Sequence, residues 1–162
     1  MIILEKHEKR NICAAIFDFD GTLSTLRAGW ENVMAPMMEE YLPGQKQKIL
    51  EFIDASTGIQ TVLQMKWLRE EVIKTGKEPL DIWEYKAEYN RRLMESVMKK
   101  REEARQDPEK YLMTGAREFL EALKERGIRL YAASGTDDAD VLEEAKCLGL
   151  DGYFDIIRGA MP

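Results

Sequence analysis

This sequence of 162 residues lacks several features that would assign it to a specialised class of protein. It has only two cysteines, Cys13 and Cys147, which are too few for a disulfide framework and too far apart for a metal site. No apolar run approaches the ~18 residues of a membrane-spanning helix. No long block of Lys and Arg occurs, and the formal net charge of −6 argues against a general nucleic-acid binder. The N-terminal residues do not resemble an export signal, so we expect a cytoplasmic protein with no nucleic-acid or membrane partner.

The composition is that of an ordinary globular protein. Apolar residues make up 44% of the chain and charged residues 33%. A chain of this length buries about 70% of its unfolded surface, so it needs no disulfide or metal to form a core. The length suits one domain, or a small domain that carries an insertion.

The hydrophobic pattern changes twice along the chain. Residues 11–19 form a short apolar run that ends in acid and glycine, which favours a buried strand of a parallel sheet. Residues 26–106 are rich in helix formers, with breaks expected at residues 43–44, 56–58 and 76–79, so we predict three or four helices there. Two apolar series have helical spacing and predict the buried faces of two of these helices. The first is Ile59, Val62, Leu63 and Trp67, and the second is Ile82, Tyr85, Tyr89, Leu93 and Val97.

Beyond Pro108, helices and strands alternate. Thr114 is expected to cap a helix that buries Phe119, Leu120 and Leu123, and strands are expected at residues 128–133 and 153–157. Asp137 and Asp138 open a further helix, where acidic side chains usually act as caps. The sequence therefore predicts an α/β fold, a Rossmann-like parallel sheet interrupted by an inserted α-helical cap. We expect residues 1–26 and 109–162 to form the core and residues 27–108 the cap.

The most informative motif is the Asp-x-Asp-Gly-Thr sequence at residues 18–22. It arises by chance on the order of 10⁻⁵ times per position. Asp18 and Asp20 lie two residues apart at the end of a strand, so they point the same way and their mutual repulsion calls for a cation. Gly21 lets the backbone turn close to a ligand, and Thr22 adds a hydroxyl group.

With this motif, the sequence resembles the haloacid dehalogenase-like hydrolase superfamily, in particular its phosphoglycolate phosphatase-like branch. Ser134 in AASGT matches the second motif of that family, and the helical stretch resembles its cap. The resemblance implies a phosphatase that acts on a small phosphorylated metabolite through an aspartyl-phosphate. Asp18 would be the nucleophile and Asp20 the general acid and base. One oxygen of the Asp18 carboxylate and the backbone carbonyl oxygen of Asp20 would bind Mg²⁺.

The resemblance also implies a phosphate-binding set. Ser134 would bind the phosphoryl oxygens, with Thr22 and with the backbone N–H groups of Gly135 and Thr136 at a helix N-terminus.

Two parts of the family pattern have no match. The 28 residues after Ser134 contain neither the third-motif Lys or Arg nor the fourth-motif acids. In the family's sheet order the apolar strand at residues 11–19 would then become an edge, which favours pairing with another chain. Three explanations follow: a C-terminally truncated fragment, a core completed by a second chain, or lost catalysis. We thus expect a phosphatase that is inactive as the isolated chain. The alternatives are a non-catalytic or partner-dependent binding module and a phosphomutase.

Overall fold

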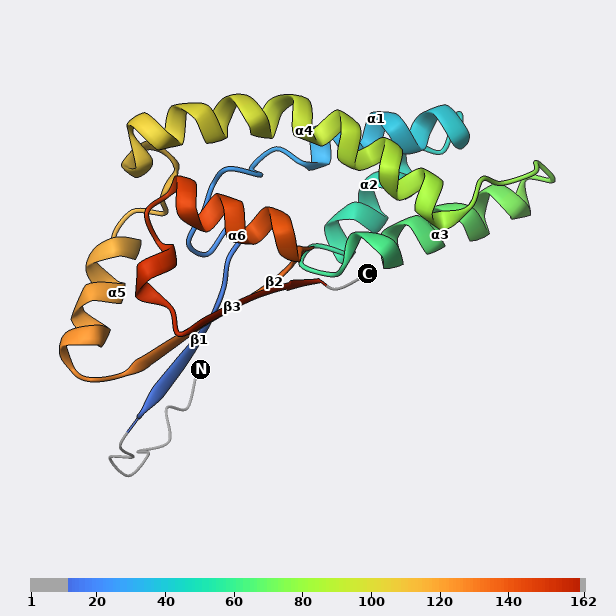
Figure 1. Cartoon of the computed structure of the whole chain (residues 1–162). Helices are drawn as coiled ribbons and strands as arrows, with labels where there is room; N and C mark the ends of the chain where they lie inside the picture. Colours follow the sequence, from blue (N-terminus) through green and yellow to red (C-terminus); the bar gives the residue numbers. More distant parts are fainter. Residues whose placement is uncertain (1–11, 161–162) are drawn as a thin grey trace, which may run out of the picture.

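A computed structural model describes residues 12–160 as a three-stranded parallel sheet with helices on one side (Figure 1). The strand order is β1-β2-β3, which confirms the α/β fold class. The strands are β1 (Ala14–Asp18), β2 (Arg129–Asp137) and β3 (Ile156–Ala160). The helices are α1 (Glu31–Tyr41), α2 (Lys46–Ala55), α3 (Thr61–Lys74), α4 (Ile82–Gln106), α5 (Ala116–Glu125) and α6 (Asp138–Cys147), with short 3₁₀ helices η1 (Pro108–Tyr111) and η2 (Asp151–Tyr153).

The second and third strands differ from the predicted bounds. β2 continues past residue 133 to Asp137, with a register shift against β3 between Ala133 and Asp137. β3 begins three residues later than expected, because the backbone of η2 turns and the Tyr153 N–H donates to the Leu150 carbonyl. The polar residues 134–136 therefore belong to a strand end.

β1 lies at the edge of the sheet, as the sheet order of the resembled family implied. It is not buried. Only α5 and α6 cover the sheet within the described residues, and both lie on the same side of it (Figure 1). On the other face Ile16 is 76% exposed and Ile156 is 47% exposed. The prediction of a buried strand was thus wrong, because an apolar run does not reveal whether both faces of the sheet are covered.

The start of α5 also departs from the prediction. Its N-cap is Gly115, at a φ of +80°, and no side chain caps the helix, so Thr114 is not its cap. Leu120 is fully buried, as expected, whereas Phe119 is 55% exposed. Phe119 lies edge-on to Phe17 of the edge strand, with ring centroids 6.0 Å apart, where no further element covers it within residues 12–160.

The helices α1–α4, which we call the helical insertion, pack around their own hydrophobic cluster. Its centre is formed by Met34, Met37, Met38 and Tyr85, which are fully buried. The expected breaks at residues 43–44, 56–58 and 76–79 all lie between helices. A second cluster, with Phe19 and Leu130, lies between the sheet and the helices α5 and α6. The predicted boundaries of core and cap stay a prediction, and their terminal residues 1–11 and 161–162 lie outside the described residues.

One of the two predicted helix faces was wrong. The buried face of α4 includes Tyr85, Tyr89, Leu93 and Val97, as predicted. The buried face of α3 instead carries Gln64, Met65, Leu68, Glu71 and Val72, while Leu63 is 51% exposed. Polar side chains can occupy this face because they have partners: Gln64 donates to Ser56, and Glu71 accepts from Lys48 and Lys74.

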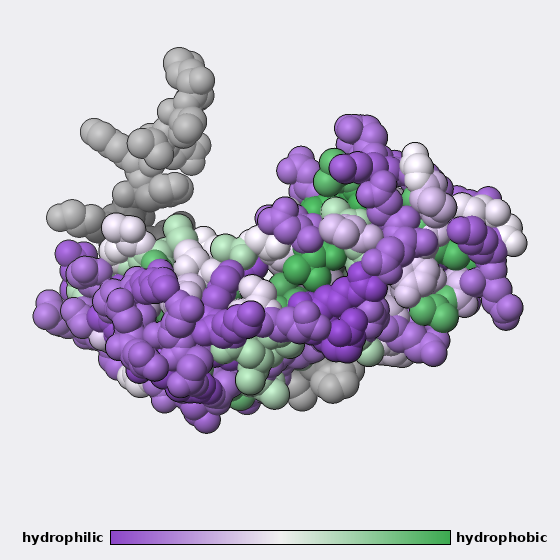
Figure 2. Space-filling model, turned by 90° about the horizontal axis from the view of Figure 1, so that it is seen from above, coloured by the Kyte–Doolittle hydropathy of each residue, from purple (hydrophilic) through white to green (hydrophobic). Residues whose placement is uncertain are grey.

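The surface on the α4 side is mostly hydrophilic, with hydrophobic residues in small areas (Figure 2). Within residues 12–160, no helix is both long and apolar enough to cross a membrane.

Gly159 of β3 lies against the segment that joins β2 to α6. A Cβ atom at this position would lie 2.4 Å from the Thr136 carbonyl oxygen and 2.6 Å from the Asp138 Cα. The Gly159 N–H donates to Asp138 Oδ1 at 2.8 Å. Only a glycine permits this approach of the two backbones.

We therefore expect Gly159→Ala to lower the free energy of unfolding by about 1–3 kcal/mol, because the backbone of residues 136–138 must shift. The matched control is Gly152→Ala, since a Cβ at Gly152 meets no atom within 4 Å. Urea unfolding followed by circular dichroism measures both. Equal midpoints for the two variants would contradict the close approach.

Candidate active site

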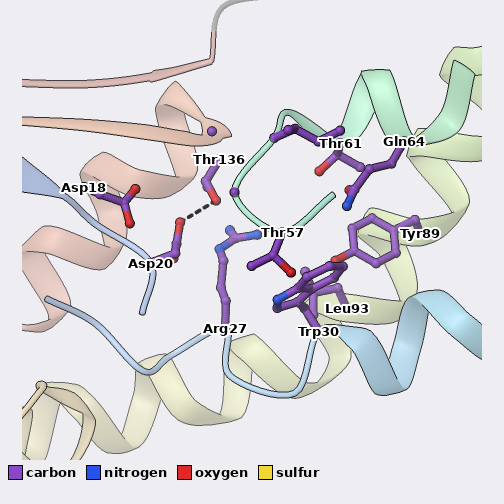
Figure 3. Close-up of a pocket in the computed structure, with 13 residues that line it drawn as sticks. Asp18, Asp20, Arg27, Trp30, Thr57, Thr61, Gln64, Tyr89, Leu93 and Thr136 are labelled. Carbon is purple, nitrogen blue, oxygen red and sulfur yellow. Dashed lines mark hydrogen bonds between the residues drawn. The ribbon is translucent and has the colours of Figure 1, made fainter. Parts of the chain in front are cut away.

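A cavity of about 210 Å³ lies between the carboxyl ends of β1 and β2 and the helical insertion. Asp18, Asp20, Gly135 and Thr136 line it from the sheet (Figure 3). Residues of the insertion line the opposite side, and Arg27 lies between the two sides. Ligands of open α/β sheets bind at this end of the strands, so the cavity is the candidate site.

The register of β1 against β2 brings the two sequence motifs together. Asp18 lies opposite Ala133, so residues 134–136 continue beside the loop that follows β1. Ser134 Oγ donates to Asp20 Oδ2 at 2.9 Å, and Thr136 Oγ1 donates to the same oxygen at 2.8 Å. Ser134 Oγ also accepts from the Thr136 backbone N–H at 2.9 Å. These bonds orient the Asp20 carboxylate.

The turn after β1 orients Asp18. Gly21 adopts a φ of +78°, and its N–H donates to the Ser24 carbonyl at 2.8 Å. This tight turn brings Thr22 back to the strand, where its hydroxyl donates to Asp18 Oδ2 at 2.9 Å. Asp18 is exposed to the cavity, while Phe19, the residue between the two acids, is fully buried.

The structure thus gathers all five residues expected at the site, in two different positions. Asp18, Asp20 and Gly135 line the cavity. Thr22 and Ser134 do not line it and instead donate to the two carboxylates. Gly135 and Thr136 belong to the end of β2, and α6 begins only at Asp138, so the expectation that they form a helix N-terminus was wrong.

Asp137 was expected to cap α6, and its side chain makes no such hydrogen bond. Its carboxylate instead accepts from Lys86 Nζ at 2.6 Å and from Asn90 Nδ2 at 3.2 Å. Both donors belong to α4, and a charged donor forms a stronger bond than a helix-cap N–H offers. Asp137 therefore connects the sheet to the helical insertion.

A second connection is a group of four charged side chains, which we call the charge cluster. Glu144 of α6 is fully buried and accepts from Arg27 Nη2 at 2.8 Å and from Arg101 Nη2 at 2.7 Å. Asp140 completes the cluster, with an oxygen 2.9 Å from Arg101 Nη2 and another 3.3 Å from Arg27 Nη2. Two positive and two negative groups therefore balance where the insertion meets the core.

The electrostatics of the charge cluster follow from this pairing. Burial alone would lower the pKa of Arg27, but the charges of Glu144, Asp20 and Asp140 outweigh burial and raise it. Burial likewise opposes the ionised form of Asp140, and the hydrogen bonds and charges of Arg101 and Arg27 outweigh it, so the pKa of Asp140 lies below its usual value. All the arginine and Asp140 charges are therefore present at neutral pH.

Sequence reasoning missed most of the insertion's side of the cavity. It is lined by Trp30, Thr57, Gly58, Ile59, Thr61, Gln64, Tyr89 and Leu93. Helical spacing marked Tyr89 and Leu93 as buried, but spacing does not separate a core position from a cavity wall. The turn at residues 57–59 reaches the site because its backbone lies against Gly135 at the end of β2, and Gln64 of α3 donates to Ser56 just before this turn.

The oxygen atoms at the site suit a hard cation such as Mg²⁺. Asp20 Oδ1 is buried and has no hydrogen-bond partner, which leaves it available to a ligand. Within the described residues no cluster of three or more His, Cys, Asp or Glu side chains could hold a metal ion. Mg²⁺ is commonly bound by one or two carboxylates together with phosphate and water, so the Asp18 carboxylate, together with the backbone carbonyl of Asp20, fits this mode.

Comparison with known proteins gives one family and a set of related folds. The family model for haloacid dehalogenase-like hydrolases matches residues 12–161. None of the curated proteins matches the chain. Among solved structures, a protein described as a predicted phosphoglycolate phosphatase from Haemophilus somnus has a TM-score of 0.61 and 16% identity. The match covers 94% of this chain and 64% of that one.

Two further solved structures share the fold. A Thermotoga maritima protein assigned as a β-phosphoglucomutase has a TM-score of 0.54 and 20% identity, with 90% of this chain and 60% of that chain covered. A Bacillus subtilis HAD-hydrolase solved with bound magnesium has a TM-score of 0.52 and 15% identity, with 93% and 66% covered. The chain thus spans about two thirds of these proteins' length or less. At such identities the likeness shows the fold alone.

The charge cluster leads to a prediction about stability. We expect Glu144→Gln to lower the free energy of unfolding by about 3–5 kcal/mol, because Arg27 and Arg101 then lack their shared buried partner. Thermal and urea unfolding measure the change. The neighbouring Glu143→Gln is the matched control, since Glu143 pairs with Arg105 at the exposed surface and its loss should change stability far less. Similar losses in both variants would show that the cluster contributes little.

Proposed function

Since the chain belongs to the haloacid dehalogenase-like hydrolases, we propose that it hydrolyses small phosphomonoesters through an aspartyl-phosphate. The observation that carries this proposal is the environment of Asp20. One of its oxygens accepts two hydroxyl groups, while the other is buried beside the cavity without a partner. A carboxyl group fixed in this way can give and take a proton within the cavity.

In the first step Asp18 acts as the nucleophile. Its carboxylate oxygen attacks the phosphorus atom, the bond between phosphorus and the ester oxygen breaks, and Asp18 becomes an acyl phosphate. Protonated Asp20 gives its proton to the departing alkoxide, which leaves as an alcohol. The hydrogen bond from Thr22 to Asp18 Oδ2 keeps the attacking carboxylate in one orientation.

In the second step water takes the place of the alcohol. Asp20, now ionised, accepts a proton from the water as its oxygen attacks phosphorus, and the bond to Asp18 breaks to release inorganic phosphate. Ser134 and Gly135 lie beside Asp20 at the end of β2, where they can donate to phosphoryl oxygens. In the free protein the Ser134 hydroxyl donates to the Asp20 carboxylate. On phosphate binding it would donate to a phosphoryl oxygen instead.

Mg²⁺ fits the site, as argued above, with Asp18 and Asp20 as its ligands. When bound, it neutralises the negative charge of the phosphate and lowers the repulsion that a carboxylate nucleophile meets. The two acids would otherwise repel an anionic substrate, since Arg27 is already paired with Glu144.

We expect Asp18→Asn to abolish Mg²⁺-dependent release of phosphate from p-nitrophenyl phosphate, because an amide does not form the acyl phosphate. Asp20→Asn should lower the rate by about 10²–10⁴-fold, the usual share of general acid–base catalysis. Asp155→Asn is the control, since Asp155 is exposed and lies outside the cavity. Undiminished turnover in Asp18→Asn would overturn the assignment.

A readout without turnover tests the same site if the isolated chain is slow or inactive. Beryllofluoride mimics a phosphoryl group on a carboxylate, and ¹⁹F nuclear magnetic resonance detects its bound form. We expect binding in the presence of Mg²⁺ and none in Asp18→Asn. Absence of both phosphate release and beryllofluoride binding in the unsubstituted chain would reject the proposed function.

A phosphomutase is a variant of the same chemistry, and the fold shared with the protein assigned as a β-phosphoglucomutase supports considering it. A mutase returns the phosphoryl group from Asp18 to another hydroxyl of the substrate, so its product is an isomeric phosphate ester. ³¹P spectra of the products separate the two activities, because only the hydrolase accumulates inorganic phosphate.

The exposure of β1 supports a different candidate, a binding module that pairs with a second chain. The outer edge of β1 has no paired strand within residues 12–160, and Ile16 on the uncovered face is 76% exposed. An apolar edge strand is a ready template for pairing.

Static light scattering tests this candidate. If the purified chain pairs through β1, we expect a mass above that of the monomer, and we expect Ile16→Lys to restore the monomer by placing a charge on the uncovered face. A monodisperse monomer of the unsubstituted chain at high concentration would count against pairing between copies.

A further inference from the structure

The part of the cavity that the helical insertion provides contains no charged side chain. Its lining residues are apolar, aromatic, hydroxyl-bearing or amide-bearing: Thr57, Ile59, Thr61, Gln64, Tyr89 and Leu93. Figure 3 shows the labelled members of this group opposite Asp18 and Asp20, with Arg27 between the two sides. A phosphomonoester bound with its phosphate at Asp18 would therefore place its leaving group among neutral residues.

Arg27 lines the cavity, but the acids of the charge cluster balance its positive charge. Its Nε and Nη2 donate to Glu144 at 3.0 and 2.8 Å, and Asp140 lies 3.3 Å from Nη2. An anionic leaving group would thus meet the charges of Asp18 and Asp20 without an unpaired cation to offset them. A cationic leaving group would meet no acid on the insertion side and would lie near Arg27.

Neutral hydrogen-bonding groups are present instead. Tyr89 is only 4% exposed, and within the described residues its hydroxyl makes no hydrogen bond. Burial raises the pKa of Tyr89, so the hydroxyl stays protonated and can donate. Tyr89 lines the cavity, so a hydroxyl without a protein partner there can donate to a ligand. Thr61 also lines the cavity and offers a second hydroxyl.

The apolar walls and the size restrict the leaving group further. Trp30, Tyr89 and Leu93 form one wall of the cavity (Figure 3). Flat aromatic walls suit a ring whose faces present C–H groups. The few polar groups of the cavity suit hydroxyls on the same ring. The volume of about 210 Å³ is below the roughly 300–1,000 Å³ of pockets for drug-sized ligands, which limits the leaving group to about one ring.

We infer that the substrate is the monophosphate ester of an uncharged, hydroxyl-bearing ring, as in a sugar monophosphate. This inference rests on the proposed function, because it takes the phosphate to lie at Asp18 and Asp20. It differs from the activity named for the Haemophilus somnus protein, since phosphoglycolate has a carboxylate in its leaving group. The class of compound follows from the insertion's residues and not from the two motifs.

Titration calorimetry on the Asp20→Asn chain with Mg²⁺ tests the inference, because this variant keeps the Asp18 carboxylate as a metal ligand and turns substrate over about 10²–10⁴-fold more slowly. The probes are inorganic phosphate, four sugar monophosphates (glucose 1-phosphate, glucose 6-phosphate, fructose 6-phosphate and ribose 5-phosphate), 2-phosphoglycolate and phosphocholine. We expect at least one sugar monophosphate to bind about tenfold or more tightly than inorganic phosphate, and the two charged probes to bind no more tightly than phosphate. Tighter binding of 2-phosphoglycolate or phosphocholine than of every sugar monophosphate would overturn the inference and leave the proposed function intact. No binding of inorganic phosphate would overturn both.

Two variants connect the result to the residues. Tyr89→Phe keeps the ring and removes the hydroxyl, so we expect about three- to tenfold weaker binding of the sugar monophosphate and unchanged binding of inorganic phosphate. Tyr153→Phe is the matched control, because the Tyr153 hydroxyl donates to Glu121 at the surface, away from the cavity. If Tyr89→Phe binds the sugar monophosphate as tightly as the chain with Tyr89 does, the Tyr89 hydroxyl does not bind the leaving group.

Ile59→Arg adds the missing positive charge on a residue that is 42% exposed, so it buries no charge. We expect this variant to bind 2-phosphoglycolate about tenfold more tightly than before, with inorganic phosphate changed less. An unchanged affinity for 2-phosphoglycolate would show that the charge of the insertion side does not select the leaving group.

Discussion

The parallel pairing of β1 with β2 is the constraint on which the rest of the structure depends. Ala14 lies opposite Arg129, 115 residues later in the chain, and this register places Asp18 beside Ala133. A shift of one residue would turn Asp18 and every other side chain of β1 to the opposite face. The hydrogen bonds from Ser134 and Thr136 to Asp20 exist only in the observed register. The sheet therefore assembles the site from two segments that are distant in sequence.

The helical insertion is positioned against this sheet by charged side chains of α4. Lys86 binds Asp137 near the cavity. Further along α4, Arg101 binds Asp140 and Glu144. Arg27, on the linker that leaves the core, shares Glu144 with Arg101. Buried groups of opposite charge stabilise an interface only when each has a partner, and here the four charges balance. The same contacts balance the positive charge of Arg27. The charge cluster therefore both positions the insertion and determines the electrostatics of the cavity.

Local signals predicted the fold well where one element decides the outcome. The strand before Asp18, though not its burial, the breaks around Gly44, Gly58 and Gly76, and the buried face of α4 all follow from short-range spacing. Errors occurred where a partner from elsewhere in the chain decides. Asp137 is no helix cap because Lys86 reaches it, and Phe119 is exposed because no element covers it within the described residues. Gln64 and Glu71 are buried on α3 because Ser56, Lys48 and Lys74 satisfy them.

The sequence by itself determined the family and the candidate reactive groups, because two acids, a glycine and a threonine after an apolar strand form a rare motif. It also determined that a helical stretch follows, since helix periodicity is a property of nearby residues. Only the tertiary structure decided what surrounds those groups. Tyr89, Ile59 and Arg27 lie far apart in the chain, and they share a cavity because α4 packs against α6 and the turn at residues 58–60 lies against Gly135 at the end of β2. Contacts between residues so far apart in the chain leave no periodic pattern in the sequence, because they depend on which segments lie close together in the folded protein.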